Sequence, residues 1–205
     1  PYKIQARTAD DLAVWVAEGE AIPIKNAMDD FTTHDLRAWK LASLFTLESS
    51  FAADAAFDVE TYITGRLAKN FSRAEENAFL NGTGVNQPAG LLHNTLGAET
   101  AVETSAVTYD DIIRLYFSVK PEYRKNAVWM MNDETAVMLR TLKDNAGNYL
   151  WRDSDDTIFG KNVVISKFMP NIAAGTKLVL FGDFRYYWIV DRSPVTVRTL
   201  SEHFA

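Results

Sequence analysis

The sequence predicts an α+β protein, and three patterns along its 205 residues support that class. The first 50 residues and the last third contain short apolar segments of strand length, separated by turn residues. Apolar residues between about 55 and 80 recur at the three- and four-residue spacing of an amphipathic helix. Because helical and strand segments do not alternate as a βαβ series, the order favours α+β over a doubly wound parallel sheet.

Composition places the chain among folded proteins and excludes several functional classes. Apolar residues make up 47% and charged residues 23%, values ordinary for a globular protein. The 21 Lys and Arg against 27 Asp and Glu give a net charge of −6, which argues against a primary nucleic-acid binder. No segment approaches the roughly 18 apolar residues of a membrane span, so no membrane partner is expected. The absence of cysteine excludes disulfides and thiolate chemistry.

The first 50 residues are expected to be extended. Tyr2, Ile4 and Ala6 alternate with polar neighbours, which is the two-residue period of a half-exposed strand. A polar segment over 18–30 predicts a long loop. Residues 36–47 fit either a strand or a helix, and we favour a strand. A strand pair with so little aliphatic content at its tip should project from its domain.

The helix expected over about 55–80 is long for a chain of this size, and Gly82 is expected to end it. Arg66, Lys69 and Arg73 share one stripe along it. Two interpretations of this basic stripe remain open. We favour a solvated face, and the alternative is a docking surface for an acidic neighbour.

The second half of the chain is expected to contain two helices and several strands. Thr108 opens a helix with a capping-box pattern that Pro121 ends, and Asn132 caps a helix over 133–142. Residues 127–131 form a strand of apolar residues, and 143–148 have the composition of a turn. Further strands are expected over 163–165, 178–181, 186–190 and 195–199.

No set of residues converges on catalysis, a metal or a cofactor. The three histidines, His34, His93 and His203, stand at no metal-ligand spacing from one another. Adjacent acids do not face each other on a helix or strand, so paired-carboxylate catalysis is not expected from them. The glycine-rich segment 81–84 follows a helix and fits no phosphate-binding template. A thin loop and a long rod cannot cover their own apolar residues, which points instead to assembly with neighbouring copies.

Four segments carry a resemblance to a known family. They are AEENAFLNGTGVNQPAGLL over 74–92, WVAEGEAIP over 15–23, LKDNAGNY over 142–149 and FGDFRYYWIVDR over 181–192. These segments resemble parts of the HK97-type major capsid proteins of tailed bacteriophages. Segment 74–92 resembles the end of the long spine helix, and 15–23 resembles the extended loop. Segment 142–149 resembles a turn of the axial domain, and 181–192 resembles the Gly-Asp-aromatic segment before the late strands. The resemblance covers almost the whole chain.

The resemblance implies an HK97-type capsid fold with three parts. Residues 1–45 are the extended loop that reaches over a neighbouring subunit, and 46–105 are the peripheral domain with its spine helix at about 55–80. Residues 106–200 are the axial domain, and 200–205 begin the return to the peripheral domain. The same resemblance implies that the chain is a fragment trimmed at both ends.

The implied function is structural rather than enzymatic. A major capsid subunit of a tailed phage or prophage forms hexamers and pentamers, and these form an icosahedral virion shell that encloses double-stranded DNA without sequence-specific binding. Assembly takes place in the bacterial cytoplasm, with scaffold or protease and portal proteins as partners. A shell protein of an encapsulin-type nanocompartment is the alternative within this fold, and an enzyme whose site has no sequence signature is a third hypothesis.

Neither a cofactor nor a metal is expected. Cross-linking is not expected either, because Ile22 stands where some relatives carry the lysine that forms an isopeptide bond. The candidate residues for contacts between subunits are Trp15, Ile22 and Pro23 in the loop and, under the docking alternative for the basic stripe, Arg66, Lys69 and Arg73.

Overall fold

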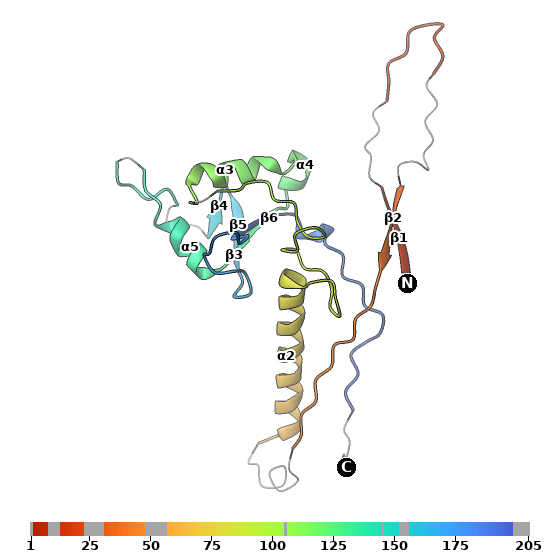
Figure 1. The fold of residues 1–205 in the computed structure, drawn as a ribbon, viewed down its shortest axis with the longest axis vertical. Coiled ribbons are helices and arrows are strands. Elements are labelled where there is room, and N and C mark those ends of the chain that lie inside the picture. The colour runs from red at the N-terminus through yellow and green to blue at the C-terminus, as the bar shows by residue number, and fades with distance from the viewer. Residues whose placement is uncertain are drawn as a thin grey trace. The chain divides into compact units, whose positions relative to one another are not determined.

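The computed structural model describes residues 2–7, 13–22, 31–47, 57–104, 106–144, 146–151 and 156–198 (Figure 1). The chain divides into two compact units. Unit 1 consists of Pro1–Trp39 and Ile189–Ala205, and unit 2 of Lys40–Trp188. Helices and sheets are mixed within unit 2, which confirms the predicted α+β class.

Unit 1 contains a two-stranded antiparallel sheet of β1 (Tyr2–Arg7) and β2 (Phe31–Leu36). Ile4 and Ala6 are half-buried while Lys3 and Gln5 are exposed, as the two-residue period predicted. Beyond Leu36 no residue of the described segment 37–47 lies in a strand or helix, so the preferred strand over 36–47 is wrong.

In unit 2, α2 (Val59–Asn81) is the predicted spine helix, and it begins about four residues later than expected. Asp58 sets this start, because its carboxylate accepts hydrogen bonds from the Glu60 and Thr61 amides at 3.1 and 3.2 Å. Within α2 only Leu80, close to the C-terminal end, is buried. The helix therefore makes its tertiary contacts mainly at that end, where it meets the sheet in Figure 1.

The returning chain after α2 forms the cap of the helix. The Leu91 and Leu92 amides donate to the Phe79 and Leu80 carbonyls at 2.7 and 2.9 Å, so carbonyls that an α-helix leaves unpaired find partners. Gly82 has φ −59°, so its lack of a side chain is needed for space and not for a left-handed turn. A Cβ there would lie 2.0 Å from the Pro88 carbonyl oxygen. The glycines of segment 82–90 thus allow the chain to pass tightly over the helix end.

A four-stranded sheet forms the centre of unit 2, in the order β4 (Thr157–Ile158), β5 (Lys161–Ile165), β3 (Val128–Met131) and β6 (Val179–Gly182). The β3 strand pairs parallel to β5 and antiparallel to β6. The helices α3 (Tyr109–Ser118), α4 (Pro121–Arg124) and α5 (Asp133–Arg140) surround it, and the short η1 (Phe184–Tyr186) follows β6.

The alternating side chains of β3 and β6 face two separate apolar clusters. Trp129 and Met131 pack with residues of α3 and α5, and the Trp129 indole donates to the Ile158 carbonyl at 2.9 Å. On the other face Met130 and Leu180 belong to the cluster that contains Leu80. The sheet is therefore covered on both sides, and α2 is anchored to the second side.

Most of the elements predicted for the second half are confirmed, and two strands are wrong. The capping box at Thr108, the strand before Asn132 and the helix that Asn132 caps are present. Residues 186–190 and the described residues 195–198 form no strand. These segments carry the side-chain pattern of strands, but a strand also needs a hydrogen-bonded partner. The described part of the chain supplies none to them.

Candidate assembly surfaces

The tip of unit 1 exposes apolar side chains around an acidic turn. The Glu20 amide donates to the Ala17 carbonyl at 3.1 Å, and Gly19 at φ +88° supplies the left-handed residue of the turn. Trp15 is fully exposed and Ile22 is 77% exposed. Pro23, the third loop residue predicted at a subunit contact, lies outside the described residues.

The predicted basic stripe lies on the exposed length of α2. Arg66, Lys69 and Arg73 are all exposed, and seven residues of helix separate the first from the last by about 10 Å. The Arg66 guanidinium lies over the Phe45 ring, 5.0 Å from its centroid. Figure 1 shows the segment 40–47 running beside α2, and in that segment Leu44 is 70% exposed. The basic stripe thus has an apolar border.

A polar joint that the sequence did not reveal fixes the end of α2 to the turn after β5. The Ser166 hydroxyl donates to the Glu76 carboxylate at 2.7 Å, and the Asn81 amide donates to the Phe168 carbonyl at 2.8 Å. From the other side, the Asn132 amide donates to the Met169 carbonyl at 3.3 Å. These partners are about 40 to 90 residues apart in the chain, so no local pattern could have identified them.

The turn over 143–149, one of the segments of the resemblance, is organised by Asp144. Its carboxylate accepts from the Asn148 side chain at 3.0 Å and from the Asn148 and Ala146 amides. These bonds, the Asn148 side chain foremost, hold the pKa of Asp144 below its usual range. Tyr149, which is exposed, stacks under the Lys143 ammonium at 4.7 Å.

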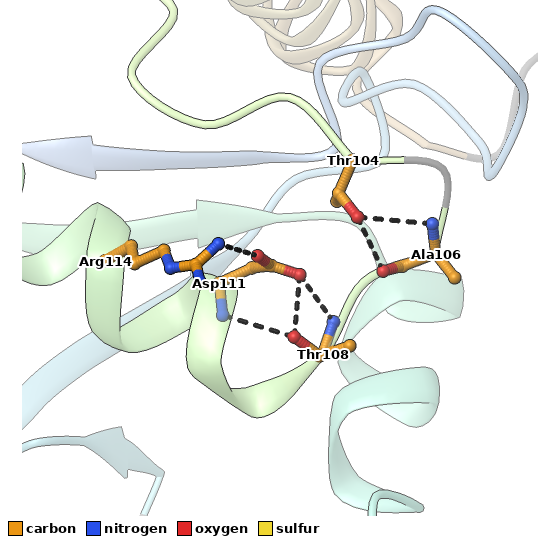
Figure 2. A network of polar contacts seen from close by, with 5 residues as sticks. All are labelled: Thr104, Ala106, Thr108, Asp111 and Arg114. Atoms are coloured by element: carbon orange, nitrogen blue, oxygen red, sulfur yellow. Dashed lines mark hydrogen bonds and ion pairs between the residues drawn. The ribbon is translucent and has the colours of Figure 1, made fainter.

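Figure 2 shows the network that begins α3. The Thr108 hydroxyl donates to the Asp111 carboxylate at 2.7 Å and accepts from the Asp111 amide at 3.3 Å. The Thr108 amide donates to the same carboxylate at 3.0 Å, and the Arg114 guanidinium lies 3.5 Å from its other oxygen. The bonds from Thr108, followed by the charge of Arg114, lower the pKa of Asp111.

The Gly-Asp segment after β6 contains a further local ion pair. The Asp183 carboxylate accepts from the Arg185 guanidinium at 2.6 and 2.9 Å, and this contact lowers the pKa of Asp183. The Tyr187 hydroxyl, whose pKa burial raises, donates to the Ala89 carbonyl at 3.0 Å, and its ring contacts Phe79 edge-on at 6.0 Å. This aromatic residue therefore belongs to the packing around the end of α2.

One cavity of about 180 Å³ lies beside α3 and β4. Most of its lining residues are apolar or aromatic, Thr157 is also among them, and the described lining contains no carboxylate or histidine. Among the described residues, each aspartate with a shifted pKa has it lowered mainly by hydrogen bonds from residues within four positions of it, so none has the raised pKa of a general acid. No group of three or more metal-ligating side chains occurs within the described ranges. Likewise, none of the described helices is long and apolar enough to span a membrane.

The fold is similar to that of capsid proteins in solved particles. The chain matches the capsid of a native GTA particle with a TM-score of 0.74 and that of an empty GTA particle with a TM-score of 0.73. In both cases the sequences are 30% identical, and the match covers 89% of this chain and 68% of the other. The predicted HK97-type capsid fold is thereby confirmed.

Two curated relatives are phage proteins. The capsid polyprotein of Pseudomonas phage PAJU2 is 23% identical over 192 residues, covering 88% of this chain and 28% of the relative. The probable major capsid protein gp17 of Mycobacterium phage L5 is 26% identical over 203 residues, covering 89% of this chain and 60% of the relative. The chain thus spans less than two thirds of either relative. Residues 1–205 match the phage capsid family throughout, and the chain belongs to that family.

Proposed function

We propose that this chain belongs to a major capsid subunit of a tailed phage or prophage and contains its HK97-type fold. The full protein assembles through hexamers and pentamers into an icosahedral shell that encloses double-stranded DNA. The role is structural and not catalytic. The observation that carries the proposal is the match to the phage capsid family along residues 1–205.

The exposed apolar residues support this proposal in physical terms. Trp15 and Ile22 at the loop tip, Leu44 beside α2 and Val195 near the end of the described chain are each at least 70% exposed. Removing apolar surface from water contributes about 25 cal/mol per Å². Burial of such residues against neighbouring copies would therefore favour assembly strongly, as in large obligate interfaces.

The proposal also assigns each range of the chain to a part of the capsid fold. Residues 1–45 act as the extended loop, 46–105 as the peripheral domain and 106–200 as the axial domain, with 200–205 beginning the return to the peripheral domain. Trp15, Ile22 and Pro23 contact a neighbouring copy from the loop. Scaffold or protease and portal proteins act with the shell, which assembles in the bacterial cytoplasm.

The experiment is to express the full-length gene product and to analyse it by light scattering and negative-stain electron microscopy. We expect hexamers, pentamers or closed shells. A full-length product that stays monomeric under all assembly conditions would overturn the proposal. The particle contents test the encapsulin-type alternative, because nuclease-protected DNA indicates a virion and a packaged enzyme indicates a nanocompartment.

The basic stripe gives a second, narrower test. We propose that Arg66, Lys69 and Arg73 dock an acidic surface of a neighbouring copy, because all three are exposed on one side of a helix in which Leu80 is the one buried residue. Reversing the three charges to Glu, or raising the salt concentration, should then loosen the oligomers. A variant with the exposed Lys120, Lys125 and Arg192 reversed has the same net charge and serves as the control. Equal assembly of both variants would contradict the docking proposal and would favour the interpretation of the basic stripe as a solvated face.

A further inference from the structure

The joint at the end of α2 contains the only Asn-Gly step in the sequence, Asn81–Gly82. Asn-Gly is the step most prone to deamidation, because a glycine without a Cβ lets its backbone nitrogen reach the preceding amide carbon. The Gly82 nitrogen attacks Asn81 Cγ, a C–N bond forms and the Cγ–Nδ2 bond breaks. The proton of the Gly82 amide joins the departing side-chain NH2 group, which leaves as ammonia. Water then opens the succinimide to aspartate or isoaspartate.

In the folded chain, hydrogen bonds occupy both reacting groups. The nucleophile, the Gly82 amide, donates to the Ala78 carbonyl at 2.9 Å. The leaving group, the Asn81 side-chain amide, donates to the Phe168 carbonyl at 2.8 Å and to the Asn77 side-chain oxygen at 3.1 Å. Reaction therefore requires that both groups leave their native partners.

The surrounding backbone makes this release a collective event. The Gly90 amide donates to the Gly82 carbonyl at 2.9 Å, and the next two amides bond the Phe79 and Leu80 carbonyls. The Leu80 side chain is 4% exposed in the core against Met169 and Leu180. The last turn of α2 must open together with the chain that caps it before Asn81 can react.

The products fit the closed joint poorly. An aspartate at position 81 has no N–H for the Phe168 carbonyl oxygen and places negative charge at a helix C-terminus. An isoaspartate adds a methylene to the backbone next to Gly82, where even a Cβ would lie 2.0 Å from the Pro88 carbonyl oxygen. The joint cannot reform its native contacts after the reaction.

We propose that Asn81–Gly82 is a deamidation site that the closed joint protects, so that its rate of modification reports the fraction of chains in which the α2 anchor is open, and the modified chain does not regain the native contacts. This inference concerns the fold of the single chain and does not depend on the proposed capsid function. It can fail while shells still form, and it can hold if they do not.

The first test compares deamidation of the folded chain with that of the same chain unfolded in urea, at one mildly alkaline pH. Peptide mass mapping and enzymatic methylation of isoaspartate measure the extent of reaction at position 81. We expect the folded chain to react at least about tenfold more slowly. Equal rates in the two states would overturn the protection.

The second test separates local opening from global unfolding with a matched pair of core variants. Leu80→Ala weakens the anchor, while Leu139→Ala removes an equally buried leucine, 3% exposed, from the cluster on the other face of the sheet. We expect Leu80→Ala to raise the rate at Asn81 by about tenfold more than Leu139→Ala. The same rise in both variants would show that only global unfolding exposes the site and would overturn the local mechanism.

The third test concerns the product. Asn81→Asp should lower the midpoint of thermal unfolding, while Asn86→Asp should leave it nearly unchanged. Asn86 lies in the exposed loop with φ 57°, a conformation that aspartate tolerates, and the substitution adds the same charge. Equal midpoints for the two variants would overturn the claim that modification opens the joint.

Discussion

Two tryptophans show how differently the two kinds of region in this protein are stabilised. Trp129 in β3 is 0% exposed, stacks on Phe181 at 4.1 Å and has its indole N–H hydrogen-bonded. Trp15 at the loop tip is fully exposed. In the sheet region, contacts within the one chain bury the large apolar side chains and pair their polar groups. On the loop and along the exposed length of α2, contacts within the chain leave such side chains exposed. The difference teaches that the sheet region supplies the buried packing that stabilises the fold, whereas the loop and most of α2 leave large apolar side chains in water.

The largest expected effect comes from exchanging these tryptophans for alanine. Trp129→Ala should destabilise unit 2 by about 3–5 kcal/mol, because it empties the centre of the core. Trp15→Ala should change stability by less than about 0.5 kcal/mol and should weaken assembly of the full protein. Urea unfolding of both variants measures the first effect, and light scattering measures the second. Similar losses of stability would contradict this contrast between the two regions.

The next effect compares two glycines of the helical region. Gly82→Ala should cost about 2–4 kcal/mol, since its Cβ would clash with backbone carbonyls of the cap. Gly65→Ala should instead stabilise α2 by about 0.5–1 kcal/mol, because nothing lies near that position and alanine is the better helix former. Thermal unfolding of the two variants gives the signs. A stabilised Gly82→Ala variant would refute the tight passage of the chain over the helix end.

A smaller effect is expected at Thr135 in α5. Its side chain is fully buried, and its hydroxyl has no hydrogen-bond partner within the part of the chain that the structure describes. Thr135→Val keeps the shape and removes the unpaired group, so we expect a gain of about 1–2 kcal/mol. Thr141→Val is the control, because the Thr141 hydroxyl donates to the Met138 carbonyl at 2.8 Å and is exposed. Chemical denaturation should show a gain only for the first variant.

The smallest effect is a pH dependence at the start of α3. The pKa of Asp111 is lowered in the folded state, so its ionised form stabilises the fold at neutral pH. That contribution is lost as the pH falls through the folded-state pKa. Thr108→Ala should cost about 1 kcal/mol at neutral pH and less in acid, where the partner carboxylate is protonated. Parallel unfolding curves at both pH values measure this, and an equal cost at both would contradict the assignment.

The sequence predicted the elements that depend on local interactions. The alternation in β1, the periodicity of α2 and the caps at Thr108 and Asn132 each involve residues within a few positions of one another. Of the site residues, Trp15 and Ile22 could be identified as exposed because apolar side chains on a thin loop have nothing to cover them. The role of these residues between subunits remains a proposal.

Only the tertiary structure decided which strand-like segments found a partner and what anchors the long helix. Residues 186–190 have a strand pattern but no ladder among the described residues, because pairing depends on distant backbone. Sequence alone correctly placed Gly82 at the end of α2. The contact with Pro88 that requires a glycine there, and the bond from Ser166 to Glu76, arise only when segments far apart in sequence meet. Local periodicity encodes the elements, and long-range packing selects their contacts.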